Sequence, residues 1–112
     1  MRDCIGRSTK RLAALAILFA ACSTPQALTA IARSHPGASY EAQTSGCGTR
    51  VPVARRFGTS LRAAVLWGRL VTDSARVVPC EVEIHALEGD SRKPVYRILR
   101  RTGYKEERVL TP

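Results

Sequence analysis

The sequence has little of several features that specialised proteins need. It holds 9 acidic residues against 18 lysines and arginines in 112 residues, and aromatic residues make up 5% of it. It also lacks the G-x-S-x-G, H-E-x-x-H, P-loop and C-x-x-C patterns that accompany hydrolysis, metal catalysis, phosphate binding and thiol redox chemistry. These absences indicate one small basic domain without a recognisable catalytic motif, for which we expect neither a metal nor a cofactor.

One histidine provides a catalytic alternative. His85 stands among Glu81, Glu83 and Glu88, and a carboxylate beside an imidazole can act as a general base. The same pattern is typical of a solvated strand face. A small periplasmic hydrolase is therefore only the second alternative function.

The N-terminal third has the pattern of an export signal. Residues 1–11 carry four basic side chains and one acid, and residues 12–21 (LAALAILFAA) have no polar side chain. A membrane-spanning helix needs about 20 apolar residues, whereas polar residues and Pro25 interrupt this run about half-way. A cleaved signal peptide fits better than an uncleaved anchor.

The end of the apolar run resembles the lipobox of bacterial lipoproteins. Phe19-Ala20-Ala21-Cys22 places two small residues before a cysteine, although that family usually has Leu, Val or Ile where this chain has Phe19. The resemblance implies cleavage before Cys22 and acylation of that cysteine, which would anchor the mature protein in a membrane. It also implies a location in the bacterial cell envelope, and Ser23 favours the outer membrane, facing the periplasm.

A second cleavage site lies eleven residues further along the chain. Ala30-Ile31-Ala32 is an A-x-A pattern, and cleavage after Ala32 would release a secreted or periplasmic protein without a lipid. A mitochondrial presequence is a weaker alternative, because residues 12–21 have no amphipathic face.

The cysteines of the mature chain form a pair. If cleavage precedes Cys22, Cys4 is removed and Cys22 is acylated, so Cys47 and Cys80 remain. An even number of remaining cysteines in an oxidising compartment predicts a disulfide. Two free thiols are one alternative, and a metal site that adds His85 is another, although no closely spaced pair of ligands is present.

Composition divides the chain into a signal peptide (1–21), a flexible tether (22–49) and a small domain (50–112). Residues 34–48 are rich in Gly, Ser, Pro and Ala, which is typical of a tether. Residues 59–72 favour a helix capped by Thr59 or Ser60, with a strand as the alternative.

The rest of the domain is predicted as strands. Val51-Pro52-Val53 suits a short edge strand. Residues 80–86 alternate in polarity with Cys80 on the apolar face, residues 88–94 form a turn cluster, and residues 95–101 alternate again. We therefore expect a hairpin, a further short strand at 108–110, and an α+β fold with one helix packed on a short antiparallel sheet.

The C-terminal third is rich in cations, which can attract lipid phosphate or an acidic polymer. The ratio of 15 arginines to 3 lysines also arises from coding bias alone. Tyr96 and Tyr104 are too few to stack bases, so nucleic acid is not an expected partner. The candidate anion-binding residues are Arg92, Lys93, Arg97, Arg100, Arg101, Lys105 and Arg108.

These patterns predict a non-enzymatic envelope lipoprotein that serves as an accessory or binding subunit of a membrane-associated assembly. Its expected partners are the membrane, through Cys22, and an envelope protein. The first alternative is a secreted basic protein that binds an anionic polymer, namely nucleic acid, lipid phosphate or an acidic polysaccharide, of which nucleic acid is the least expected.

Overall fold

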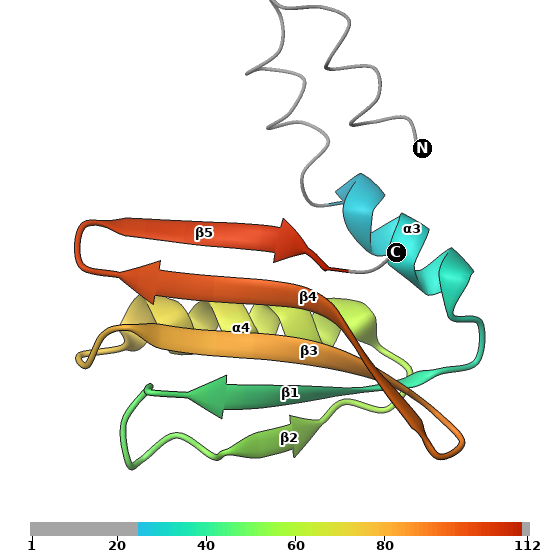
Figure 1. The fold of residues 1–112 in the computed structure, drawn as a ribbon, viewed down its shortest axis with the longest axis horizontal. Coiled ribbons are helices and arrows are strands. Elements are labelled where there is room, and N and C mark those ends of the chain that lie inside the picture. Colours follow the sequence, from blue (N-terminus) through green and yellow to red (C-terminus); the bar gives the residue numbers. More distant parts are fainter. Residues whose placement is uncertain (1–24, 111–112) are drawn as a thin grey trace, which may run out of the picture.

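The computed structural model describes residues 25–110, which form two helices and a five-stranded antiparallel sheet (Figure 1). The strand order is β2-β1-β3-β4-β5. This architecture confirms the expected α+β class, while the predicted signal peptide (1–21) and Cys22 lie outside the described residues. In chain order the elements are α3 (Pro25–Ser34), β1 (Ser39–Ser45), β2 (Ala54–Arg56), α4 (Leu61–Ser74), β3 (Cys80–Glu88), β4 (Ser91–Arg101) and β5 (Tyr104–Val109).

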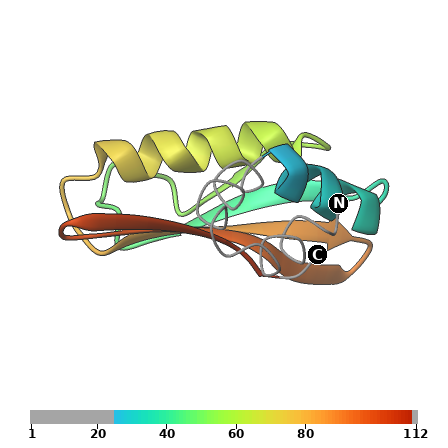
Figure 2. The same ribbon diagram turned by 90° about the horizontal axis from the view of Figure 1, so that it is seen from above.

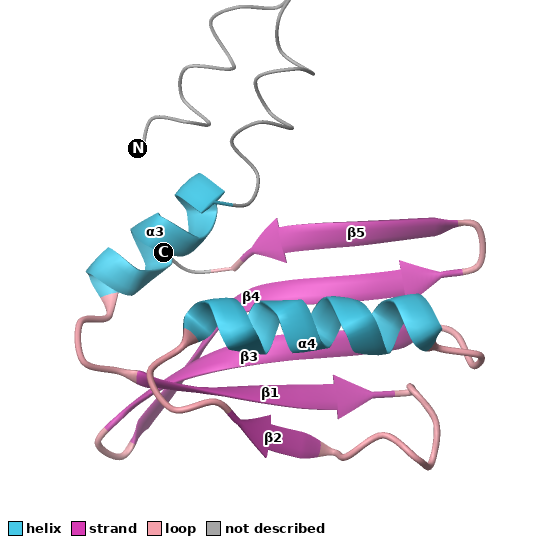
Figure 3. Ribbon diagram, turned by 180° about the vertical axis from the view of Figure 1, so that it is seen from behind, coloured by secondary structure: helices cyan, strands magenta, loops and turns pink. Residues whose placement is uncertain are grey.

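The helices lie on one side of the sheet, and among residues 25–110 no helix covers the other side (Figure 2). α4 connects β2 to β3 and runs along the sheet (Figure 3). Gly68 allows a close approach, because a Cβ at this position would lie 2.9 Å from Ile98 Cδ1 and 3.1 Å from Val82 Cγ1. The core therefore lies between α4 and one sheet face, and we call the opposite face the open face.

α4 begins where the sequence predicts a helix. Ser60 is its N-cap, and the side chain accepts a hydrogen bond from the backbone N–H of Ala63 at 3.1 Å. Leu61, Ala64 and Val65 are buried on the face toward the sheet. The helical interpretation of residues 59–72 is confirmed, and the strand alternative is wrong.

β3 and β4 form the predicted hairpin. Val82 pairs with Ile98 under α4, and the next pair, Glu83 with Arg97, lies on the open face. β4 begins at Ser91 rather than after Pro94. The strand can include Pro94 because the register shifts beside it, between Ile84 and His85, at a bulge where a missing backbone N–H is tolerated.

The predicted tether over residues 22–49 is wrong from residue 25 onward, because this stretch holds α3 and β1. β1 lies between β2 and β3, and its Tyr40 and Ala42 are buried. The sequence of β1 is SYEAQTS. Only Tyr40 and Ala42 are apolar, and the remaining residues of the strand are polar. That composition also suits a linker. The edge strand, β2, begins directly after the predicted one at 51–53.

Candidate functional site: the open face of the sheet

Cys47 and Cys80 form the predicted disulfide. Cys47 follows β1 by two residues and Cys80 is the first residue of β3, so the bond links neighbouring strands at one end of the sheet. Among the described residues no cysteine is free. The free-thiol alternative and a metal site built on these two sulfurs are therefore wrong.

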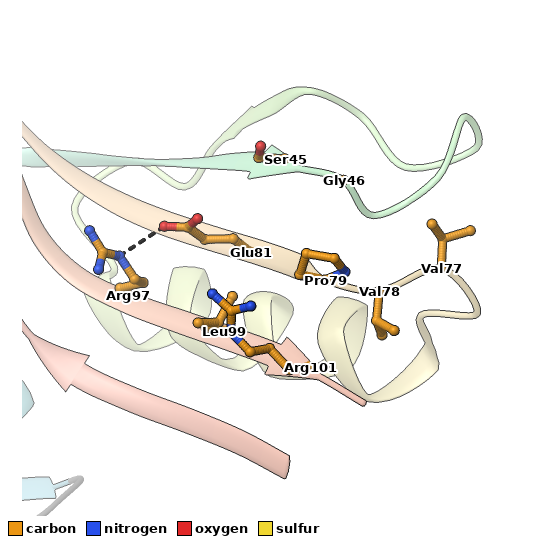
Figure 4. A pocket seen from close by; sticks show the side chains of 9 residues that line it. All are labelled: Ser45, Gly46, Val77, Val78, Pro79, Glu81, Arg97, Leu99 and Arg101. Atoms are coloured by element: carbon orange, nitrogen blue, oxygen red, sulfur yellow. Dashed lines mark ion pairs between the residues drawn. The ribbon is translucent and has the colours of Figure 1, made fainter. Parts of the chain in front are cut away.

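A shallow hollow of 520 Å³ lies next to this disulfide (Figure 4). Its apolar lining includes Val77, Pro79 and Leu99, and Val77 is 54% exposed. Gly46 closes one side with a φ of +74°, and a Cβ there would lie 2.4 Å from the Pro79 carbonyl oxygen. The disulfide and this close backbone contact together fix the side of the hollow that Gly46 and Pro79 form.

Two arginines of β4 line the hollow. Arg97 forms an ion pair through Nε with Glu81 Oε2 at 2.8 Å, as the dashed line in Figure 4 shows. A second contact joins its Nη2 to Glu83 Oε2 at 3.4 Å. Arg101 is exposed and has no ion pair within residues 25–110. The hollow thus combines an apolar lining with one neutralised and one available guanidinium group.

An ion-pair network extends from the hollow across the open face to β2, the edge strand beside β1. Glu41 of β1 contacts Arg92 of β4, and it accepts from Arg56 Nε of β2 at 3.4 Å. The hydrogen bond from Arg92 holds the pKa of Glu41 below its ordinary value, against the opposing effect of burial. Glu41 therefore stays charged although it is almost fully buried.

His85 occupies the middle of this network, between Arg92 and Glu83. Its Nδ1 lies 3.1 Å from Arg92 Nη1, and because a guanidinium group only donates, Nδ1 must accept. On the other side of the ring, Nε2 donates to Glu83 Oε1 at 2.8 Å, because a carboxylate oxygen accepts. This hydrogen bond lowers the pKa of Glu83 more than burial raises it.

The structure corrects the expected exposure of His85, which is only 7% exposed. Arg92 and Glu83 engage both ring nitrogens, and in the described part of the chain no Ser, Thr or Cys side chain bonds to the ring. Glu88 lies elsewhere, with His35 Nδ1 3.1 Å from its carboxylate. The predicted cluster therefore provides no pair of nucleophile and base.

The candidate anion-binding cations do not form one surface. Strand alternation sends Arg100 to the helix side, where Nη1 donates to the Thr72 and Asp73 carbonyls at 2.9 and 2.7 Å. Lys105 also contacts Asp73 there. Three more are ion-paired on the open face, where Arg101 has no ion pair within residues 25–110. Lys93 pairs with core-facing Ala86 across the strands, so it lies on the helix side of the sheet, and it also has no ion pair in this range. The three paired residues are Arg92 (to Glu41), Arg97 (to Glu81 and Glu83) and Arg108 (to Glu106).

Two members of the open-face network, Glu41 and Arg56, were missed from the sequence. Glu41 lies in the stretch assigned to the tether, and it is the only acid between Asp3 and Asp73. A single carboxylate in a long basic segment is the signal that could have located it. Without a strand assignment for residues 39–45, nothing placed it opposite Arg92.

No protein-family model, curated protein or solved structure matches this chain. Within residues 25–110 no helix is long and apolar enough to span a membrane. The same residues contain no cluster of three or more His, Cys, Asp or Glu side chains arranged to hold a metal ion. Function must therefore be inferred from the residues and their arrangement.

Proposed function

We propose that the protein is a non-enzymatic lipoprotein of the bacterial cell envelope, in which acylated Cys22 holds a small binding domain on a membrane. Its partner would be an envelope protein, and the outer membrane facing the periplasm is the favoured location. The observation that carries this proposal is the position of α3 in the fold.

α3 is part of the folded domain. Ile31 is 0% exposed in the core, and Leu28 packs against that core. Cleavage after Ala32 would divide the helix and remove Ile31 from its packing, at a cost of several kcal/mol. Cleavage before Cys22 would leave every described residue in place. The extent of the fold therefore supports Cys22 over Ala32 as the start of the mature chain.

The disulfide gives independent support for export. Structural disulfides form and persist in oxidising compartments such as the bacterial periplasm. Cys47 and Cys80 are both buried, which suits a permanent bond rather than a reactive one.

The binding role rests on the open face. The hollow is lined from the ends of β1, β3 and β4 that lie away from α3 in Figure 1, and in Figure 4 α4 lies behind the sheet from it. An anchor preceding Pro25 would leave it accessible to a partner. An apolar side chain over Pro79 and Leu99 and a carboxylate near Arg101 would match its chemistry. A polyanion has less support, because most of the candidate cations are already engaged and they lie on two faces.

Fractionation of cells that express the full chain tests the anchor. Cys22→Ala should remove the mature protein from the membrane fraction, because it deletes the thiol that the lipobox presents. Cys4→Ala is the matched control, since it removes the other N-terminal cysteine and should fractionate like the wild type. Mature Cys22→Ala protein that remains with the membranes would overturn the proposal.

A further inference from the structure

Two leucines on α4 point away from the sheet. Leu66 is 50% exposed and Leu70 is 62% exposed, and their spacing of four residues places them on one side of the helix. That side is opposite to buried Ala64 and Gly68. An amphipathic helix in water normally carries polar residues there, so this apolar pair suggests a surface that something covers.

The pair adjoins a groove between the helices. The groove measures 550 Å³, and Leu28 of α3 faces Val65 and Leu66 of α4 across it. Arg62 lies on its rim, and Arg33 is exposed in the last turn of α3. Neither arginine has an ion pair within residues 25–110.

The two helices therefore present apolar and cationic side chains together. Asp73 is the only acid in α3 and α4, and it is paired with Lys105 of β5. No unpaired carboxylate of these two helices would oppose an anionic ligand.

We propose that this helical surface, defined by Leu28, Arg33, Arg62, Leu66 and Leu70, lies on an anionic phospholipid bilayer. The inference rests on the proposed function, because it requires an acylated Cys22. Pro25 follows Cys22 by three residues, which span at most about 10 Å. Acyl chains in the bilayer would bring the start of α3, and the groove beside it, to the membrane surface.

The small size of the patch favours a membrane over a second copy of the chain. A stable protein interface buries about 800 Å² on each partner, which two half-exposed leucines and a narrow groove do not supply. A weak lipid contact suffices for a protein that is already tethered, because the anchor makes the contact intramolecular. The open face and its hollow would then point away from the bilayer.

Environment-sensitive fluorescence of the acylated full chain tests this orientation. A nitrobenzoxadiazole label is placed on Leu70→Cys, with Cys47 and Cys80 left bonded. The matched control is Tyr104→Cys, because Tyr104 is 52% exposed and lies on the open face. Each protein is reconstituted into phosphatidylcholine vesicles with and without phosphatidylglycerol.

We expect emission from the label at position 70 to shift to shorter wavelength on vesicles, with a larger shift when phosphatidylglycerol is present. The label at position 104 should keep the emission wavelength that it has in water. If acylated protein sediments with the vesicles but position 70 stays aqueous, the orientation is wrong and the proposed function stands. A shift at 104 alone would also overturn the orientation. A concentration-dependent shift at 70 without vesicles would assign the surface to a second copy. Absence of the acyl group by mass spectrometry would overturn both proposals.

Discussion

Glu107 of β5 illustrates how single residues hold the two layers together. Arg69 of α4 donates to both of its carboxylate oxygens at 2.8 Å, and the Tyr96 hydroxyl donates at 2.6 Å. Burial alone would raise the pKa of Glu107, but these hydrogen bonds outweigh it and the pKa is lowered. Burial raises the pKa of Tyr96, so its hydroxyl remains a donor.

Glu107→Ala should lower the free energy of unfolding by about 2–3 kcal/mol, because Tyr96 and Arg69 lose a partly buried acceptor. Since the folded-state pKa is depressed, this contribution is full above the unfolded value of about 4.3 and decreases as the pH falls through the folded pKa. Urea unfolding at several pH values measures it. Glu106→Ala is the control, because its pair with Arg108 is more exposed and worth about 1 kcal/mol or less. Equal losses would contradict the assigned role.

At the scale of elements, the disulfide is the cross-link that the sheet depends on. It closes a separation of 33 residues that contains β2 and all of α4. Removing it enlarges the unfolded ensemble without altering the hydrogen bonds of the ladder. The stabilisation should therefore appear mainly as a shift in unfolding midpoint.

Cys47→Ala with Cys80→Ala should lower the free energy of unfolding by about 3–4 kcal/mol on the chain-entropy account. Denaturant titration with and without reductant measures this loss. Reductant should destabilise the wild type by a similar amount and leave the double variant unchanged. A wild type that ignores reductant would show that the bond does not form in solution.

Elements with strong local signals could be predicted, and elements with weak ones could not. The cap at Ser60, the helical spacing of α4 and the alternation of β3 each specify structure within a few residues. β1 and α3 depend on distant partners instead. Tyr40 and Ala42 of β1 need β3 beside them, and Ile31 is the only fully buried residue of α3. The residues around Tyr40, Ala42 and Ile31 are mostly small or polar, so the buried residues of β1 and α3 are hard to recognise in the sequence.

At the scale of the whole molecule, the helical and open sides have different chemistry. The cations of β4 are close in sequence, yet alternation sends Arg100 under α4 and Arg101 to the open face. The disulfide could be predicted from the number of cysteines that remain after the expected cleavage before Cys22 and acylation of that residue. The hollow could not, because it needs Gly46, Pro79 and Leu99 to meet from separate segments.

α3 is the first described element of the domain, and the proposed anchor, Cys22, precedes its first residue by three positions. The intact mass of the mature protein, purified from the membrane fraction without reductant, tests this most directly. We predict a chain that begins at Cys22, carries acyl groups, and lacks the two hydrogens lost when Cys47 and Cys80 bond. A chain that begins at Arg33, or an unmodified chain that begins at Met1, would contradict the account.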